Sequence, residues 1–335
     1  MGKPFISVVI IAYNRREFIR DAVKSAIDST ISEDGYELIV VKNFRDEYVD
    51  SVVKKLGGKN IFADFASIGA KVVLGVKAAS GDVIPFLEDD DMYIPRRLKD
   101  IRNEFECEPS LIYYHNNVLV INELGKPRYD ELVEKTNIHE KVIASTYEDK
   151  VDAFMNHGWN LGLRLSSMAV RRSFLMRWVD VIKLFPDLVD VLIFMLALVD
   201  KGVVLHDPRR STYYRISGMS ASSVRAMMDP MTRFTRASKN ATRHALARHM
   251  LVTLANHIGF SKHVKYDEAT VIGGIYGGLG RWLVIRAVID LIGCKSVTCI
   301  GSIMLGLIYM VSPWLSKRLV YLYYVRAFGI WGLKS

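Results

Sequence analysis

Four consecutive carboxylates are the side chains with the clearest chemical potential in this sequence: Glu88, Asp89, Asp90 and Asp91. They follow the apolar segment 82–87, and neighbouring carboxylates repel one another unless a cation is present. Hard divalent cations prefer carboxylate oxygens and can bridge them to phosphates. A helix N-terminus is the alternative, because Asp91 could cap a helix that Pro95 opens. Capping accounts for one or two of the four acids, so the run predicts a metal site.

Buried strands and amphipathic helices alternate over the first part of the chain and would place this acidic run at the edge of a sheet. Residues 5–12 form a nearly unbroken apolar run, which is typical of a strand buried on both faces. Apolar residues between 18 and 27 recur at helical spacing, and 36–41 and 82–87 read as further buried strands. Such alternation predicts an α/β sheet that binds ligands at the carboxyl ends of its strands.

The C-terminal third has a different pattern. Residues 296–315 carry no formal charge, and a segment of about 20 apolar residues is long enough to cross a bilayer. Three neighbouring apolar segments contain charges, and each is either an interfacial helix or a span whose charges face a protected interior: 246–260, 272–292 and 319–333. We therefore expect two or three membrane helices. The predicted division is an α/β domain over 1–225, a basic amphipathic connector over 226–245 and a membrane domain over 246–335.

The composition agrees with a folded chain of two unlike parts. Half of its 335 residues are apolar and 24% are charged, which excludes intrinsic disorder as the main state. Three cysteines cannot form a disulfide framework and fit a reducing compartment. The N-terminus lacks a signal-peptide pattern, so we expect the chain to begin in the cytosol. The net charge of +9 suits a nucleic acid, an anionic membrane surface or phosphorylated ligands.

In four segments, in order along the chain, the sequence resembles the family 2 glycosyltransferases. Residues 7–15 are similar to the first strand and nucleotide-binding turn of that family, and 81–91 to the segment that ends in its Asp-x-Asp metal motif. The segment that begins at Asp190 stands where the family has the helix of its catalytic base, and 214–220 resembles its terminal phosphate segment. The resemblance implies an α/β domain with the GT-A (Rossmann-like) fold, followed here by an α-helical membrane domain.

The resemblance also implies a nucleotide sugar lying across the carboxyl edge of the sheet. It implies that ten residues bind this nucleotide-sugar donor: Ala12, Tyr13, Asn14, Arg15, Lys42, Lys71, Asp89, Arg215, Ser217 and Ser220. Ordinary alternatives exist for these positions, such as a plain strand-to-helix turn, a solvated lysine or a surface arginine. After the second strand the family commonly has Asp-Asp-Gly-Ser, in which the first Asp contacts the base, and this sequence instead has Val41-Lys42-Asn43-Phe44. This departure leaves the nucleotide base open.

The implied metal is Mn²⁺ or Mg²⁺, held by Glu88 and Asp90 with Asp91 close enough to share the ion. Glu88 departs from the family, which has an aspartate there. The ion would stabilise the negative charge that develops on the departing nucleoside diphosphate. Asp190 is the implied general base and Asp187 its rival, with a helix cap as the alternative for either residue. A carboxylate at the start of a very apolar helix has a perturbed proton affinity, which suits a base.

The predicted membrane helices favour a lipid-linked acceptor. The combination resembles the polyprenyl- and dolichyl-phosphate mannosyltransferases and the cellulose-synthase-like enzymes. The Gln-x-x-Arg-Trp motif of the second, processive branch is absent from the sequence. We expect inverting, non-processive transfer to a polyprenyl or dolichyl phosphate or its glycan-bearing form, with GDP-mannose as the donor by analogy. A UDP-sugar used for an envelope polysaccharide is the alternative. The catalytic domain is expected on the cytoplasmic side of the cell membrane.

Two other classes of protein remain open at this point. A non-enzymatic membrane-surface binder would use a basic stretch: Arg233, Arg236, Lys239, Arg243 and Arg248. Few aromatic residues lie between these charges, which argues against a nucleic-acid partner. The third class is a soluble glycosyltransferase whose C-terminal helices form an oligomer core. Binding of a nucleotide sugar separates the enzyme from the binder, and a need for detergent separates the membrane enzyme from the soluble one.

Overall fold

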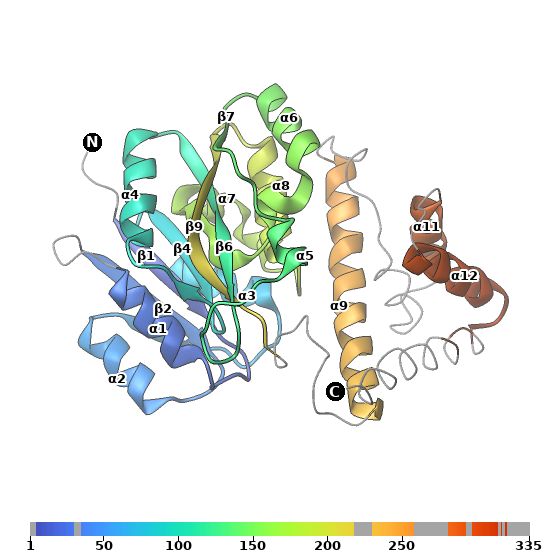
Figure 1. The fold of residues 1–335 in the computed structure, drawn as a ribbon, viewed down its shortest axis with the longest axis horizontal. Helices are drawn as coiled ribbons and strands as arrows, with labels where there is room; N and C mark the ends of the chain where they lie inside the picture. Colours follow the sequence, from blue (N-terminus) through green and yellow to red (C-terminus); the bar gives the residue numbers. More distant parts are fainter. Residues whose placement is uncertain are drawn as a thin grey trace. The chain divides into compact units, whose positions relative to one another are not determined.

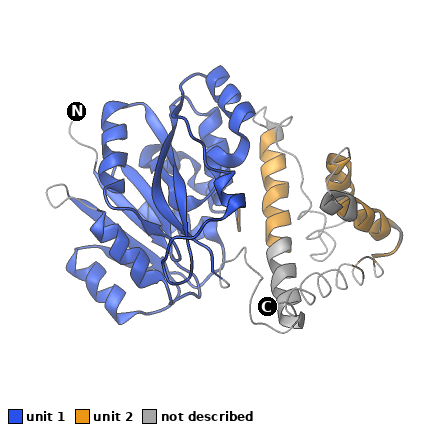
Figure 2. Cartoon of the chain, viewed as in Figure 1, with its two compact units in different colours: residues 1–185, 189–217 blue, residues 186–188, 218–335 orange. Residues whose placement is uncertain are grey.

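The computed structural model describes most of the chain, namely residues 5–29, 35–217, 230–257, 281–292, 297–313, 316 and 319. The chain divides into two compact units (Figure 2): unit 1 comprises residues 1–185 and 189–217, and unit 2 comprises residues 186–188 and 218–335. The predicted domain boundary at residue 225 lies outside the described residues.

Unit 1 is built on a mixed sheet in which nine strands are described (Figure 1). The strand order is β3-β2-β1-β4-β8-β6-β9-β5, and β7 pairs with β9. The strands are β1 Ile6–Ile11, β2 Tyr36–Lys42, β3 Lys59–Phe62, β4 Val83–Glu88, β5 Met92–Tyr93, β6 Leu111–Ile121, β7 Val142–Ala144, β8 Met168–Arg171 and β9 Val203–Arg215. Strands β1 to β4 are parallel, whereas β8 is antiparallel to both of its neighbours, β4 and β6.

Helices cover both faces of this sheet (Figure 1). The α-helices of unit 1 are α1 Ile19–Asp28, α2 Glu47–Lys55, α3 Ile68–Ala78, α4 Arg97–Cys107, α5 Glu131–Glu134, α6 Tyr147–His157, α7 Arg172–Ile182 and α8 Val189–Val199. Two short 3₁₀ turns, η1 Gly158–Gly162 and η2 Leu165–Ser167, precede β8. The predicted helices over 18–27 and after Pro95 are confirmed as α1 and α4.

Strand β1 lies at the centre of the parallel half, and its alternate residues face two different cores. Val8 and Ile10 belong to a buried cluster that includes residues of α1, α2 and α4. Val9 points to the other face, where a Cβ added at Gly75 of α3 would lie 2.4 Å from Val9 Cγ1. Burial on both faces explains why the sequence of this strand is an unbroken apolar run.

The register of the parallel strands places three strand ends at one edge. Ile11 is level with Val41 of β2 and with Glu88 of β4. The residues that follow β1, β2 and β4 therefore leave the sheet side by side. This confirms the predicted α/β sheet with candidate site residues at its carboxyl edge.

The sequence did not predict the second half of the sheet. Strands β6 and β9 are parallel to each other with several register shifts, and the four-residue β8 joins β6 to β4. Strand β3, at the outer edge, has mostly exposed residues and lacks an apolar run. The strand character of such segments depends on the neighbours they pair with rather than on their own periodicity.

In unit 2 the described helices are α9 Pro230–His257, α11 Arg281–Leu291 and α12 Val297–Val311. None of the helices among the described residues combines the length and the apolar character that a membrane crossing requires. The predicted span 296–315 is described as a helix of 15 residues, and nearly all of the predicted segment 319–333 lies outside the described residues. The predicted membrane domain is therefore not confirmed.

Candidate active site

The acidic run forms a buried turn at the carboxyl end of β4, which we call the acidic turn (residues 88–91). Glu88 is the last residue of the strand, and the Asp89 N–H donates to the Ile11 carbonyl at 3.1 Å. The Asp91 N–H donates back to the Glu88 carbonyl at 3.2 Å. Asp89, Asp90 and Asp91 are only 0%, 7% and 2% exposed. These carboxylates are therefore packed inside the protein rather than displayed on a solvated loop.

Fixed partners hold the aspartates of the turn. Asp89 Oδ2 accepts a hydrogen bond from the Tyr13 N–H at 3.2 Å, and Asp91 Oδ1 accepts one from the Arg215 N–H at 2.9 Å. The Arg15 guanidinium forms ion pairs with both Asp89 and Asp90. Burial alone would lower the pKa of Arg15, but these carboxylates outweigh burial and raise it.

Burial and mutual repulsion shift the proton affinities of the turn. Burial raises the pKa of Glu88, and the charges of Asp90, Asp91 and Asp190 raise it further. Burial raises the pKa of Asp89 to about 7 even though an arginine pairs with it. Burial also raises the pKa of Asp91 to about 7, with Asp90 adding to the effect. An additional cation would stabilise the ionised form of these groups.

The donor set of the turn fits the predicted cation in its chemistry. All of its ligand atoms are carboxylate oxygens, which Mn²⁺ and Mg²⁺ prefer, and Glu88, Asp90 and Asp91 would supply them. In the present arrangement, however, no group of three acidic, histidine or cysteine side chains converges on a metal position within the described parts of the chain. Asp89 and Asp90 are instead drawn to Arg15. Metal binding therefore stays a prediction. It requires the carboxylates that pair with Arg15 to change their side-chain orientation.

The chain reverses direction after β1 through Asn14, which adopts a left-handed conformation with φ +59°. Asparagine adopts this conformation more readily than most residues. Its N–H donates to Asn43 Oδ1 at 2.9 Å, and Asn43 Nδ2 donates to Asn14 Oδ1 at 2.7 Å. The Nζ of the buried Lys71 lies 3.9 Å from the centre of the Tyr13 ring. The structure thus brings together predicted donor residues from β1 and α3.

Two predicted donor residues are directed elsewhere. Ala12 is buried beneath the turn, and its N–H donates to the Val41 carbonyl at 2.9 Å. Lys42 is 4% exposed and forms an ion pair with Asp50 of α2. It contributes to a pocket of about 620 Å³ at the edge of the sheet, lined by Lys42, Phe44, Arg45, Asp50, Lys54, Gly58, Asn60 and Phe62. The Lys42 amine is therefore engaged by a carboxylate of α2.

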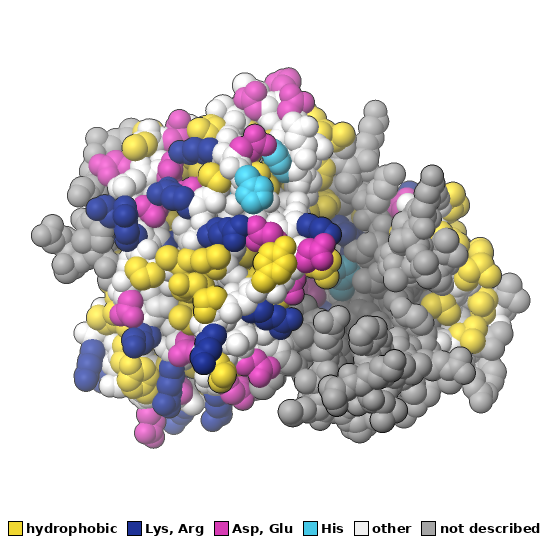
Figure 3. Space-filling view, viewed as in Figure 1, with side chains coloured by type: hydrophobic (Ala, Val, Ile, Leu, Met, Phe, Trp, Pro, Cys, Tyr) yellow, Lys and Arg dark blue, Asp and Glu magenta, His cyan; other side chains and the backbone are white. Residues whose placement is uncertain are grey.

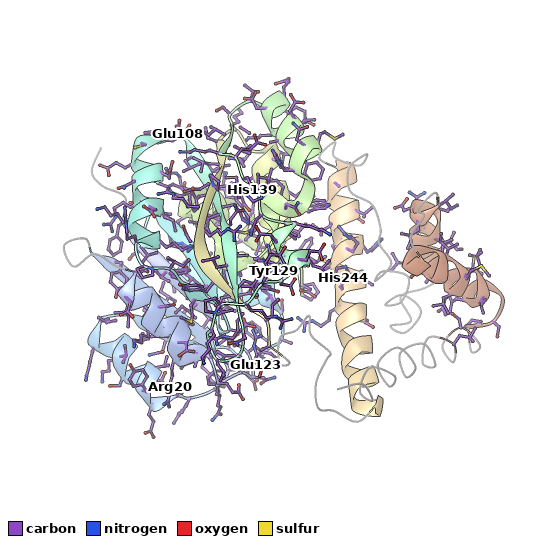
Figure 4. The ribbon with its side chains drawn as sticks, in the orientation of Figure 1. Arg20, Glu108, Glu123, Tyr129, His139 and His244 are labelled. Atoms are coloured by element: carbon purple, nitrogen blue, oxygen red, sulfur yellow. The ribbon has the colours of Figure 1, made fainter. Side chains whose placement is uncertain are left out.

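Arg215, the last residue of β9, is a buried clamp with 1% exposure. Its Nε donates to the Asp90 carbonyl at 2.8 Å, and one terminal nitrogen donates to Asp21 Oδ2 at 3.0 Å. The other terminal nitrogen donates to the carbonyls of Asn122 and Glu123, in the hairpin marked by Glu123 in Figure 4. All of its side-chain nitrogens are therefore bonded to protein, and a phosphate contact would require Arg215 to release some of these partners.

For three further predicted residues, the structure gives little indication of a role in the site. Ser217 is buried at 3% exposure just after β9, and Ser220 lies outside the described residues. Asp187 Oδ1 accepts a hydrogen bond from the Leu188 N–H at 2.9 Å. Because Leu188 precedes α8, this bond is local to the loop before the helix and is not a helix cap.

Asp190 lies in the first turn of α8, as predicted, and a backbone N–H from another segment fixes the orientation of its side chain. Asp190 Oδ2 accepts a hydrogen bond from the Arg164 N–H at 2.9 Å. Arg164 has a left-handed φ of +69°; its side chain donates to Thr136 Oγ1 at 2.9 Å and lies over the Tyr214 ring. Because the charge of Asp190 contributes to the raised pKa of Glu88, the predicted base and the acidic turn share one electrostatic environment.

Sequence reasoning missed three residues of this site. Ser166 Oγ accepts a hydrogen bond from the Glu88 N–H at 2.9 Å although 78 positions separate the two residues. Arg164 orients Asp190 through a backbone conformation that no sequence pattern announced. Asn43 did have a signal, since it stands in the segment where the sequence departs from the family. That departure marked the position without indicating its partner, Asn14.

Comparison with known proteins relates part of this chain to a protein family. Residues 7–170 match the family described as glycosyl transferase family 2. An uncharacterized glycosyltransferase of Rickettsia typhi is 24% identical over 115 residues, which are 33% of this chain and 36% of that protein. Protein CgeD of Bacillus subtilis is 27% identical over 135 residues, which are 36% of this chain and 31% of that protein. The matched segments thus span about a third of the length of these relatives.

A solved structure shares the fold over a larger part of the chain. The structure of S. aureus TarS 1–349 in complex with UDP-GlcNAc aligns with a TM-score of 0.54 and 15% identity, over 91% of each chain. The mixed sheet of unit 1 is therefore the GT-A glycosyltransferase fold. Residues 7–170, just under half of the chain, thus match the family 2 glycosyltransferases.

Proposed function

We propose that this protein transfers a hexose from a nucleotide sugar to an acceptor, with inversion at the anomeric carbon. One observation carries the proposal: the turn after β1, the acidic turn and Asp190 belong to one site. Asp89 accepts from the Tyr13 N–H. The Glu88 N–H donates to Ser166 Oγ, and Asp190 accepts from the N–H of Arg164, two residues before Ser166. A nucleotide-binding turn, a phosphate-facing charge cluster and a general base are the parts that such a transfer requires.

The donor side favours a uridine nucleotide over the guanosine nucleotide that analogy suggested. The Asn43 amide, bonded to Asn14, has one donor group and one acceptor group. These match the adjacent acceptor and donor on the O4 and N3–H edge of uracil, whereas the two neighbouring N–H groups of guanine favour a carboxylate. S. aureus TarS, which shares the fold, has been solved with UDP-GlcNAc. We therefore propose a UDP-sugar donor and keep GDP-mannose as the alternative to test.

The acidic turn would hold Mn²⁺ or Mg²⁺ through Glu88 and Asp90, with Asp91 beside them. Such an ion, when bound, stabilises the negative charge that develops on the departing nucleoside diphosphate. The chain contributes fixed geometry to the same region. The backbone N–H groups of Tyr13 and Arg215 hold Asp89 and Asp91 in place, so the rearrangement that metal binding requires falls mainly on Asp90.

On the acceptor side we propose Asp190 as the general base. The acceptor oxygen attacks the anomeric carbon while the bond from that carbon to the phosphate oxygen breaks. The acceptor proton goes to Asp190, and the nucleoside diphosphate leaves with the bonding electrons. The Arg164 N–H holds Asp190 Oδ2 in place for this step, and a single displacement inverts the configuration of the sugar.

For the acceptor we propose a polyprenyl or dolichyl phosphate, or a glycan carried on it, at the cytoplasmic face of the cell membrane. The uncharged segment 296–315 and its apolar neighbours support a location at a lipid bilayer. Flotation of the full chain with anionic vesicles tests this location. Recovery of a monodisperse protein without detergent that does not float would favour the soluble oligomer instead.

A non-enzymatic surface binder is less well supported. On the face of unit 1 in Figure 3, Lys and Arg side chains alternate with Asp and Glu side chains and do not form one basic field. An electrostatic binder of membranes or nucleic acid requires such a field. Much of the basic stretch from Arg233 to Arg248 lies outside the residues whose side chains are described.

Thermal stabilisation of the purified protein tests the proposed donor. We would compare UDP, GDP, UDP-sugars and GDP-mannose, each with and without Mn²⁺. A Mn²⁺-dependent increase in Tm with UDP compounds alone is the expected result. An increase with GDP compounds alone would restore the mannose prediction and overturn the role of Asn43. No increase with any nucleotide would contradict the enzyme and favour the surface binder.

A further inference from the structure

The Arg15 guanidinium lies against the acidic turn, a contact that the sequence alone did not predict. Its two terminal nitrogens form ion pairs with Asp89 and Asp90, and the Nη2–Asp90 Oδ1 contact adds a hydrogen bond at 3.2 Å. The left-handed Asn14 directs the chain back over the strand end. The neighbouring Arg16, by contrast, is exposed, with its guanidinium 5.3 Å from the centre of the Phe44 ring.

Arg15 engages one of the three carboxylates that the divalent cation would need, namely Asp90. Other oxygens of the turn are already engaged, since Asp89 Oδ2 accepts from Tyr13 and Asp91 Oδ1 accepts from Arg215. Both oxygens of Asp90 contact Arg15. A carboxylate that pairs with a guanidinium through both of its oxygens binds a metal ion less readily, because the two cations repel each other at that distance.

We infer that Arg15 and the divalent cation compete for Asp90, so that metal binding displaces the Arg15 guanidinium from this carboxylate. The inference rests on the proposed function only in taking the turn as the metal site. In this arrangement Arg15 acts as the resident counter-ion: it neutralises part of the buried charge when no metal is bound, and it lowers the apparent metal affinity.

Direct metal binding tests the competition without an activity assay. Mn²⁺ affinity would be measured by electron paramagnetic resonance and calorimetry on the full chain, with and without UDP. Arg15→Gln is expected to bind Mn²⁺ about tenfold more tightly than the wild type, because the competing cation is removed. Arg16→Gln is the matched control: it removes one positive charge at the next position but contacts no carboxylate of the turn, so its affinity should stay within about twofold of the wild type.

A second variant and a second readout protect the test against misfolding. Arg15→Lys keeps the charge but lacks the fork that engages two carboxylates, so its Mn²⁺ affinity should lie between those of the wild type and Arg15→Gln. The increase in Tm on adding Mn²⁺ should also be larger for Arg15→Gln than for the wild type, since the metal replaces a missing counter-ion.

The contrary outcomes are distinct. Equal affinity in the wild type, Arg15→Gln and Arg16→Gln would overturn the competition and leave the metal site intact. Weaker binding in Arg15→Gln would also overturn it and make Arg15 a support of the metal site. No Mn²⁺ binding to any of these proteins, with or without UDP, would remove the competition and the proposed metal dependence together. An equal gain in both glutamine variants would reduce the effect to general charge.

Discussion

Unit 1 contains two groups of buried polar side chains, and the cost of burying them is compensated in different ways. In the cluster between β6 and β9, His115 Nδ1 and His206 Nδ1 are 3.0 Å apart, and each ring also contacts a backbone carbonyl through Nε2. On the opposite face of the same two strands, the Tyr114 hydroxyl donates to Asp207 Oδ2 at 2.9 Å. The two histidines contact each other and backbone carbonyls without any net charge, although two neutral imidazoles supply only two N–H donors for these three histidine contacts.

The acidic turn instead collects like charges. Glu88, Asp89, Asp90 and Asp91 lie in sequence, with Arg15 as the cation that pairs with two of them. Burial raises the pKa of Glu88, whereas burial lowers the pKa of both histidines in the other cluster. The difference teaches that the histidine contacts need no further charge, whereas the unbalanced charge of the turn is the feature that the proposed metal site would use.

The largest expected effect is on the acidic turn. Asp90→Ala should reduce sugar transfer and donor hydrolysis by about 10³-fold or more, because a ligand of the proposed ion is lost. The free energy of unfolding should change by less than about 1 kcal/mol, since removing one of four like charges also relieves repulsion. Kinetics and urea denaturation of the same preparation check both statements. Retained turnover would make the turn as structural as the histidine cluster.

The next largest effect concerns Asp190 and distinguishes two acceptors. Asp190→Asn keeps an oxygen that can accept from the Arg164 N–H but cannot take a proton. Turnover should fall by about 10²- to 10⁴-fold if the acceptor is a sugar hydroxyl. A phosphate acceptor has a second pKa of about 6 and needs little help from a base, so turnover would then be nearly normal. Assays with both acceptor types on the two proteins decide between them, and an equal loss with both would contradict the role of Asp190 as a base.

The two clusters should have opposite effects on stability as the pH changes. Burial lowers the pKa of His206 to about 4, against about 6.5 in an unfolded chain. Between these values only the unfolded chain binds the proton, so the contribution of His206 is complete above pH 6.5 and falls by about 3 kcal/mol towards pH 4. The pKa of Asp89 is raised to about 7, so the folded state binds this proton first and stability from Asp89 rises as the pH falls below 7.

Urea denaturation between pH 7.5 and pH 4 would separate these terms, with His206→Gln and Asp89→Asn as the variants. The advantage of the wild type over His206→Gln should shrink as the pH falls. The wild type should gain relative to Asp89→Asn over the same range, because the asparagine already resembles the protonated acid. Parallel curves for all three proteins would mean that neither cluster titrates as the structure implies.

The smallest expected effect is on base recognition. Asn43→Asp replaces a donor and an acceptor with two acceptors, which should weaken UDP binding about tenfold, equivalent to about 1.4 kcal/mol. GDP binding should weaken less or improve. Asn103→Asp adds the same charge at an exposed position of α4 and should leave the ratio of the two affinities unchanged. An unchanged ratio in Asn43→Asp itself would exclude Asn43 from base recognition.

The parts of this protein that could be predicted were those encoded by short-range patterns. The apolar run of β1, the helical spacing of α1 and the acidic residues after β4 are each read within about 10 residues. They sufficed to predict an α/β sheet with carboxylates at its edge. Strands β6, β8 and β9 were missed because their strand character comes from partners far away in the sequence.

The sequence by itself thus determined which residue types reach the carboxyl edge, since strand burial and periodicity are local properties. Only the tertiary structure decided which atoms they meet there. It directs Lys42 to Asp50, closes Arg215 onto Asp21 and the acidic turn, pairs Asn14 with Asn43, and brings Arg15 to carboxylates 74 and 75 positions away. These pairings depend on the packing of separate elements, and a charge binds the partner that packing brings within reach.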